Sequence, residues 1–349
     1  MRTIQFDSLP RSIQVIWAFI QAAIVLYGLG VSGYLAARLA VGERWAWVAF
    51  ANNLMPWWAL GGLAAAGLAL FSTHRWPLIA LQIPGIAAFL VLYGSLILPH
   101  ALAAGTGGNP HPPLRVATYN TLSVRSDPAR VVDVIAGLSA DLVGLQELGP
   151  RHADLLAERL GAQYPHQALH PLLPVHGVGL LSRYPIREAE AIRLLPDSML
   201  SLRAVVEVDG APVAVFVVHP RPPANAFSPL TYNSVLRDRE INLLLDDHLG
   251  GVTGPLIVMG DFNMTDQSDI YRAVSARLDD AFRRAGRGLG FTYPAPHKPA
   301  RRIVAGLVRI DYIWHNAHFT ALDAWPGQDS GTSDHRPVVA ELAWKRGEY

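Results

Sequence analysis

Three long apolar stretches dominate the first hundred residues of the chain. None of them contains Asp, Glu, Lys or Arg, and each exceeds the roughly 20 residues that a helix needs to cross a bilayer. Tryptophans lie near several of their ends, as in the aromatic belts of membrane interfaces. The pattern predicts a transmembrane region over residues 1–100, with three spanning helices near residues 12–37, 45–71 and 76–99.

The charges beside these stretches barely favour one orientation. An inward N-terminus leaves three arginines in the cytoplasm and two outside. The following linker, residues 101–113, is rich in Gly and Pro and has no Lys or Arg, which indicates an extended tether and favours an external position for the rest of the chain. No ionisable residue lies inside the stretches, so the usual signature of transport is missing. We expect a multi-pass anchor in the plasma or inner membrane, with the lipid bilayer as partner.

From residue 114 the pattern changes to short β-rich runs that alternate with helical stretches. Too many strands follow one another in the middle for a purely parallel βαβ sheet, which favours mixed sheets packed together and covered by helices. Strands are expected at residues 114–119, 141–145, 177–181, 202–208, 213–218, 256–259, 309–314 and 337–343, and helices at residues 128–138, 151–160, 228–249 and 270–284.

Composition narrows the chemistry. The 349 residues suffice for two or three structural units, and the net charge of +1 names no partner. The absence of Cys excludes disulfides, thiolate nucleophiles and cysteine metal sites. Acidic residues slightly outnumber basic ones from residue 114 on, which counts against a sequence-independent DNA binder. Residues 283–309 are locally basic, and Arg301 and Arg302 there belong either to a solvated loop or to a lip that meets phosphates.

The most informative stretch is residues 255–265, PLIVMGDFNMT. A short apolar run predicts a buried strand, and Asp261 and Asn263 follow it on the same side of the chain. A carboxylate there can bind a metal or activate a water, and a neutral amide can hold a substrate oxygen without adding repulsive charge. The pair suits attack on an anionic centre such as a phosphate.

Further polar side chains come at strand ends. Asn120, Glu147 and His219 each follow an apolar run. Asp311 lies inside an apolar strand, where burial is costly without a partner, and a histidine can be that partner. The carboxylates of Glu147, Asp261 and Asp334 are hard oxygen ligands suited to Mg²⁺ or Mn²⁺.

These residues form an ordered set of motifs that resembles the endonuclease/exonuclease/phosphatase superfamily. The motifs are VATYNTL at residues 116–122, LVGLQEL at 142–148, His219-Pro220, MGDFN at 259–263, RIDYI at 309–313 and SDHRP at 333–337. The resemblance covers residues 114–343 and none of the apolar region. It implies a catalytic domain over residues 114–349 with a four-layered α/β sandwich, and an enzyme that hydrolyses phosphoric ester bonds.

The resemblance also implies roles. Glu147, supported by Asn120, would bind the catalytic Mg²⁺ (or Mn²⁺), and Asp334 would complete the metal or water network. Asp261 would deprotonate the attacking water, and Asn263 would hold a phosphate oxygen or the nucleophile. His335, held by Asp311, would contact the scissile phosphate. His219 would help to protonate the leaving oxygen. Arg203, Arg301 and Arg302 are weaker candidates for substrate contacts.

The substrate stays open at this point. The expected function is that of a membrane-anchored, Mg-dependent phosphodiesterase, nuclease-like by family, acting on a nucleic acid or a lipid headgroup. Phospholipid or sphingomyelin-type phosphodiesterase and phosphomonoesterase activities are the alternatives. A catalytically inert membrane scaffold is a second alternative, which predicts the loss of at least one site residue.

Overall fold

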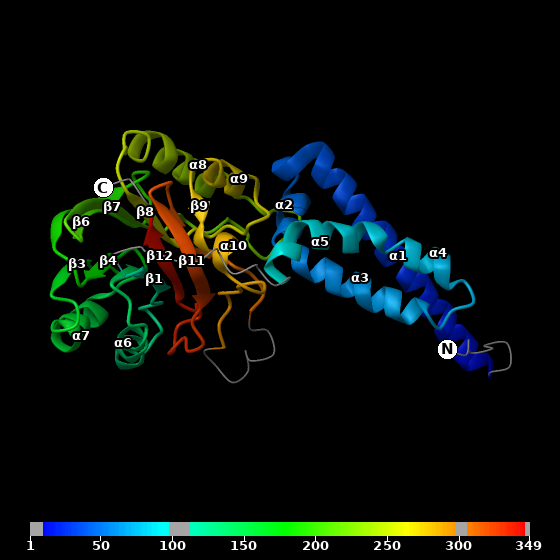
Figure 1. Ribbon diagram of the computed structural model, residues 1–349. Helices are drawn as coiled ribbons and strands as arrows, with labels where there is room; N and C mark the ends of the chain where they lie inside the picture. The colour runs from blue at the N-terminus through cyan, green and yellow to red at the C-terminus, as the bar shows by residue number, and fades with distance from the viewer. Residues whose placement is uncertain (1–9, 98–111, 297–305, 346–349) are drawn as a thin grey trace. The chain divides into compact units, whose positions relative to one another are not determined.

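The computed structural model describes residues 10–97, 112–296 and 306–345 (Figure 1). The chain divides into two compact units, one of residues 1–99 with 227–232 and one of residues 100–226 with 233–349. We call them the helical unit and the catalytic unit. The expected linker lies mostly outside the described residues, as do Arg301 and Arg302.

The helical unit contains two helical stretches, Arg11–Arg44 and Arg75–Ile97, that are long and apolar enough to cross a membrane. The expected third span, near residues 45–71, is wrong, because the helix there breaks at residues 53–54 into a short and a medium piece. Asn52 and Asn53 end the first piece, and Pro56 occupies the first turn of the second. The helices of the unit are α1 (Arg11–Val41), η2 (Gly42–Arg44), α2 (Ala46–Asn52), α3 (Met55–Ala69), α4 (Arg75–Ala80) and α5 (Ile83–Ile97).

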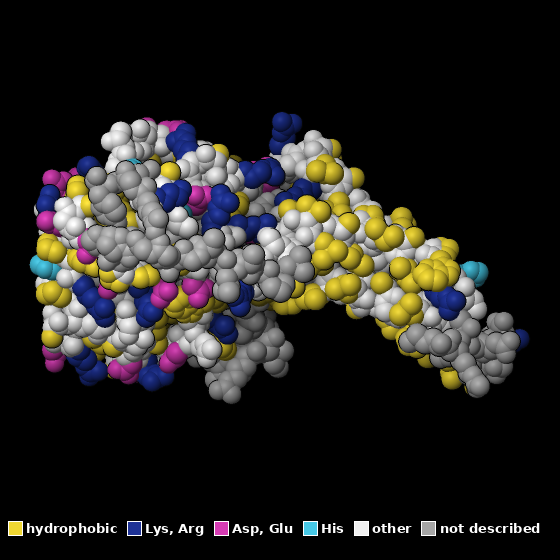
Figure 2. Space-filling model, viewed as in Figure 1, with side chains coloured by type: hydrophobic (Ala, Val, Ile, Leu, Met, Phe, Trp, Pro, Cys, Tyr) yellow, Lys and Arg dark blue, Asp and Glu magenta, His cyan; other side chains and the backbone are white. Residues whose placement is uncertain are grey.

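Much of the visible surface of these helices is apolar (Figure 2), and some of their polar side chains bond to each other across helices. Figure 2 shows hydrophobic side chains over much of the visible face of α1, α3 and α5. The Tyr34 hydroxyl donates to Asn52 Oδ1 at 2.7 Å, and Gln21 Nε2 donates to Ser72 Oγ at 2.7 Å. Hydrogen bonds of this kind join helices in an apolar solvent.

The catalytic unit is built on two six-stranded mixed sheets. The first sheet has the order β11-β12-β1-β2-β4-β3, and the second has β5-β6-β7-β8-β10-β9. The strands are β1 (Leu114–Asn120), β2 (Leu142–Gln146), β3 (His166–His170), β4 (Val178–Ser182), β5 (Ile186–Arg193), β6 (Leu200–Val208), β7 (Ala211–Val218), β8 (Leu256–Asp261), β9 (Asp279–Asp280), β10 (Asp311–His315), β11 (Phe319–Pro326) and β12 (Val338–Trp344).

Helices cover the outer faces of both sheets (Figure 1). On the first sheet, α6 (Pro128–Gly137) and α7 (Pro150–Leu160) bury Ile135 and Leu156 against strands β1, β2 and β4. On the second, α8 (Val235–Leu243) and α9 (Asp269–Ser275) bury Ile241 and Val274 around Trp314. The two sheets pack against each other at Gly144, where an added Cβ would lie 2.7 Å from Met259 Sδ. These layers confirm the expected four-layered α/β sandwich.

Two expected helices are shorter than the sequence indicated. Residues 228–234 form no helix, and α8 begins at Val235 and passes into a π-helical turn, Leu244–His248. The expected helix over residues 270–284 is also wrong: it is interrupted by β9 between α9 and α10 (Ala281–Ala285). Asp280 causes that restart, because its carboxylate caps the N–H groups of Phe282 and Arg283.

The strand register brings the strand ends of interest to one edge. Strands β1 and β2 run parallel, as do β7 and β8, so residues that follow all four strands emerge at the carboxyl edge of their sheets. At the end of β8, Gly260 has φ +153°, and a Cβ there would lie 1.9 Å from the Val218 carbonyl oxygen. Only glycine lets β7 and β8 approach this closely beside Asp261.

We predict that Gly260→Ala destabilises the catalytic unit by about 3 kcal/mol or more, because the methyl group would overlap backbone atoms that cannot move independently. Denaturant unfolding of the solubilised protein measures the change. Gly251→Ala is the matched control, since an added Cβ there meets nothing within 4 Å, and it should change stability by less than about 1 kcal/mol. Equal stability of the two variants would contradict the stated role of Gly260.

Candidate active site

A cluster of polar side chains lies at the carboxyl edge of the two sheets. Its members come from segments far apart in the sequence and are mostly buried. They are Asn120 at the end of β1, Glu147 after β2, His219 after β7, Asp261 at the end of β8, Asp311 at the start of β10 and His335 before β12. The structure therefore brings together six of the residues expected from the sequence.

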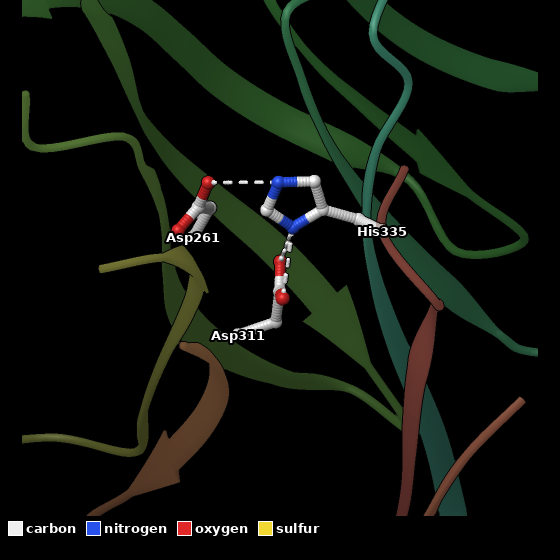
Figure 3. Close-up of side chains that lie close together, drawn as sticks. All are labelled: Asp261, Asp311 and His335. Atoms are coloured by element: carbon white, nitrogen blue, oxygen red, sulfur yellow. Dashed lines mark hydrogen bonds and ion pairs between the residues drawn. The ribbon is translucent and has the colours of Figure 1, made fainter. Parts of the chain in front are cut away.

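The centre of the cluster is His335, held between two carboxylates (Figure 3). Asp261 and Asp311 are opposite each other in the antiparallel pairing of β8 and β10. The Nδ1 atom of His335 lies 3.0 and 3.1 Å from the two Asp311 carboxylate oxygens, and its Nε2 lies 3.6 Å from Asp261 Oδ2. All three residues are at most 5% exposed. Asp311 thus has the histidine partner that its burial requires.

Burial and neighbouring charges set the protonation of this centre. Burial alone would lower the pKa of His335, but Asp311 and then Asp261 raise it to about 10, so the ring is a cation at neutral pH. Burial raises the pKa of Asp261 to about 7 against the opposing effect of His335. Burial and the charge of His335 lower the pKa of His219 to about 3, so this second ring is neutral.

Glu147 is held in a strained conformation next to Asn120. Its φ of +52° places it in the left-handed region, which is uncommon for a residue other than glycine. Thr121 Oγ1 donates to the Glu147 carbonyl oxygen at 2.9 Å. The Asn120 Nδ2 group donates to Glu147 Oε1 and to Asp261 Oδ2, both at 3.1 Å, and so links the two carboxylates.

The donor set fits a divalent metal ion. The Oε2 atom of Glu147 is buried and has no hydrogen-bond partner among the described residues. Burial raises the pKa of this carboxyl group, because the charged form is costly to bury. A bound cation would offset that cost. One ligand atom each from Asp261, Asp311 and His335 also lies within 4.8 Å of the others. His335 is already bound to Asp311 through Nδ1, so the unpaired oxygen of Glu147 is the better anchor for Mg²⁺ or Mn²⁺.

In this arrangement Asn120 orients the carboxylates. Its Oδ1 accepts a hydrogen bond from the Leu122 N–H at 3.1 Å, and its Nδ2 faces the cluster. A direct metal-ligand role would need the opposite orientation of the carboxamide, with Oδ1 toward Glu147. Asp334 lies at the margin, with Oδ1 4.0 Å from His335 Nε2.

Asn263 and His219 complete the cluster on the side of β7. His219 Nε2 lies 3.5 Å from Asp261 Oδ2, and its Nδ1 is buried without a hydrogen-bond partner among the described residues. Asn263 has φ +51°, its N–H donates to Asp261 Oδ1, and its Nδ2 donates to the Pro220 carbonyl oxygen at 2.9 Å. One N–H of the Asn263 amide therefore holds the loop that follows β7.

Of the remaining predicted contacts, Arg203 does not join the cluster. Arg203 is exposed in the middle of β6, opposite Glu190 of the edge strand β5. Arg301 and Arg302 lie outside the described residues.

Several supporting residues escaped the sequence analysis. Arg237 on α8 is 1% exposed, and its guanidinium donates to the Asn263 carbonyl oxygen at 2.9 Å. Ser333 Oγ donates to the Asn120 carbonyl oxygen and accepts from the His335 N–H, which ties the two segments together. The Tyr293 ring lies 4.9 Å from the ring of His335. Arg237 and Tyr293 read as ordinary surface or turn residues in the sequence, so no pattern marks them, whereas Ser333 lies in the SDHRP motif but was given no role of its own.

Comparison with known proteins agrees with this fold. A model of the endonuclease/exonuclease/phosphatase family matches residues 117–335. The fold is similar to that of an endonuclease/exonuclease/phosphatase from Beutenbergia cavernae DSM 12333, at 22% identity over 67% of this chain and 72% of that chain, with a TM-score of 0.56. No curated protein matches the chain.

Two further solved structures share the fold. One is D. rerio TDP2 complexed with single strand DNA product, at 19% identity over 66% of this chain and 98% of that chain, with a TM-score of 0.52. The other is the human Nocturnin catalytic domain with bound sulfate anion, at 18% identity over 68% and 97%, with a TM-score of 0.50. At these identities the likeness concerns the fold.

We predict strong coupling between Asp311 and His335. Each alanine variant leaves an uncompensated buried charge and should cost about 3–5 kcal/mol of unfolding free energy. The double variant should cost less than the sum of the two by about 2 kcal/mol. Denaturant unfolding of the four proteins gives the coupling energy.

The exposed pair Asp141 and Arg183, 3.1 Å apart, provides the control cycle. Its coupling energy should stay below about 1 kcal/mol, because water screens it. Additive effects of the Asp311 and His335 variants would contradict the pairing.

Proposed function

Because this chain belongs to the endonuclease/exonuclease/phosphatase family, we propose that it is a divalent-metal-dependent phosphodiesterase held in a membrane by its N-terminal helices. The family makes it a phosphoester-hydrolysing enzyme. One observation carries the finer proposal: a buried carboxylate oxygen without a partner, on Glu147, beside a paired His335 and Asp261. That arrangement suits charge development at phosphorus.

Glu147 would hold the metal ion, with Asn120 fixing the carboxylate and Asp334 at the margin of the site. A bound Mg²⁺ or Mn²⁺ supplies positive charge that offsets the negative charge growing on the phosphate oxygens. The strained backbone of Glu147, with φ +52°, serves this role. This conformation turns the Glu147 side chain into the cluster, while the Thr121 hydroxyl holds the Glu147 carbonyl group.

Asp261 is the proposed general base. Its pKa of about 7 lets it accept a proton from water near neutral pH, and the Asn263 N–H fixes one of its oxygens. His335 is a cation, and it faces the same carboxylate. We assign it to the phosphate, where it would bind an oxygen and stabilise the charge formed during attack. Asp311 keeps the ring in position.

His219 is the proposed donor to the leaving oxygen. The ring is neutral in the absence of substrate, because its pKa is about 3. It would gain a proton, and so be able to donate one to the leaving oxygen, only after the negative charge of a bound phosphate raises that pKa. Its Nδ1 has no hydrogen-bond partner among the described residues. Asn263 would hold a substrate oxygen with the N–H that Pro220 does not occupy.

The two apolar helical stretches support a membrane anchor, and the linker without Lys or Arg favours an external catalytic unit. A phosphodiester is the proposed substrate, as in nucleic acids and in lipid headgroups. The inert-scaffold alternative loses its basis, because it predicts a lost site residue and the cluster is complete.

We predict that Glu147→Gln lowers kcat for a simple phosphodiester such as bis(4-nitrophenyl) phosphate by about 100-fold or more, and that it raises the Mg²⁺ concentration needed for half-maximal activity. Removal of metal by chelation should abolish wild-type activity, and Mg²⁺ or Mn²⁺ should restore it. Calorimetric titration with Mg²⁺ gives an independent measure of the lost site.

Glu158→Gln, on the exposed face of α7, is the matched control and should behave as wild type. Wild-type metal dependence in Glu147→Gln would refute the assignment of this carboxylate.

A further inference from the structure

Seven large hydrophobic side chains are exposed among the described residues from 112 on, and all seven belong to loops or a helix start beside the active site. Isolated surface hydrophobics are normal, but their gathering at one edge marks an interaction surface. We call them the apolar rim: Val124, Leu172, Leu173, Phe227, Leu230, Val235 and Leu236.

Two of the rim loops border Glu147. The loop after β1 carries Val124, and its Ser123 N–H bonds to the Glu147 carbonyl oxygen. The loop between β3 and β4 carries Leu172 and Leu173, and the Leu172 N–H bonds to the Leu148 carbonyl oxygen at 3.0 Å. Strand β4 runs antiparallel to β2, so this loop lies at the carboxyl edge of β2.

The third rim segment follows His219 directly. A bridge between Ala224 and Asn233 closes it into a loop. Phe227 and Leu230 in this loop are 85% and 80% exposed, more than any other large hydrophobic side chain of the rim. Val235 and Leu236 open α8, and the next residue of that helix binds the Asn263 carbonyl oxygen. The helix-start part of the rim, Val235 and Leu236, therefore lies next in sequence to the residue that holds the Asn263 backbone.

Two observations indicate what covers the rim. The helices that precede the catalytic unit in the chain include both candidate membrane spans, Arg11–Arg44 and Arg75–Ile97. Only sixteen residues separate α5 from β1, so the first strand can start at most about 55 Å along the chain from the end of a span. A tethered surface of Phe, Leu and Val has a bilayer within reach and the composition of an interfacial contact.

We propose that the apolar rim docks on the bilayer that holds the chain's own helices, and that the active site takes its phosphodiester from a lipid headgroup at that surface. This inference rests on the proposed function for the chemistry of the site. The docking itself depends on the exposed side chains alone, so the two can be tested separately.

Docking is tested by fluorescence in the full-length protein. The chain has no Cys, so Phe227→Cys and Ala317→Cys each give one attachment point for an environment-sensitive dye. Ala317 is exposed in the turn between β10 and β11, at the opposite edge of the second sheet. The proteins are reconstituted in phosphatidylcholine and phosphatidylglycerol vesicles that contain nitroxide-labelled lipid.

The dye at position 227 should be quenched by the nitroxide lipid at least threefold more than the dye at position 317. Equal quenching at the two positions would overturn docking. Self-quenching between labelled copies, without quenching by lipid, would also overturn it and would assign the rim to an interface between copies of the chain.

The substrate claim is tested with the variant Phe227→Ser/Leu230→Ser and the apolar replacement Phe227→Trp/Leu230→Phe. The serine variant should release headgroups from vesicle phospholipid at least tenfold more slowly than wild type, and the apolar replacement should restore the rate. Hydrolysis of soluble bis(4-nitrophenyl) phosphate should change less than twofold in both.

A serine variant that loses both activities equally, or neither, would refute the lipid substrate. A wild-type protein that hydrolyses neither substrate would refute the proposed function, whereas the dye measurement would still decide the docking.

Discussion

The register of β8 against β10 imposes the constraint on which the site depends. It sets Asp261 opposite Asp311 in a buried part of the second sheet, where two like charges repel each other. His335 relieves this repulsion, and it comes from the segment that leads into β12 of the first sheet. One imidazolium thus joins the two sheets at their edge. The contacts of His335 with Asp261 and Asp311 allow the sandwich to bury both carboxylates. They also keep the imidazole ring charged and in position to bind a phosphate.

Much of this site could be predicted from the sequence, because several of its polar side chains come directly after apolar runs. Asp261 and Glu147 follow buried strands, and the burial of Asp311 called for a partner. That the partner is His335 came from family resemblance, since no spacing rule joins residues 24 apart across two sheets. The predicted helix bounds were wrong where apolar residues did not belong to a continuous helix. Leu230 falls in a loop although the helix was expected to start at residue 228, and the apolar run at residues 45–71 contains a helix break at its two asparagines.

Supporting residues were hidden for another reason. Arg237 reads as a solvated charge on a helix, yet it is buried and holds the backbone of Asn263. The edge strand β5 carries Glu188 and Glu190 on its exposed face and offers no apolar run. Tertiary contacts determine the burial of Arg237 and the formation of β5, so neither has a local signal in the sequence.

The apolar rim and the carboxylate cluster share one edge of the sandwich. The surface that this chain binds and the substrate that it hydrolyses are therefore linked questions.

The central claim is that the cluster around Asp261 and His335 directs water to phosphorus. Hydrolysis of a phosphodiester by the full-length protein in ¹⁸O-labelled water, followed by ³¹P NMR of the product, tests it most directly. The account predicts a single ¹⁸O atom on the phosphomonoester product, and no labelled product from the Asp261→Asn variant under the same conditions. Label in the released alcohol, or full incorporation by Asp261→Asn, would contradict it.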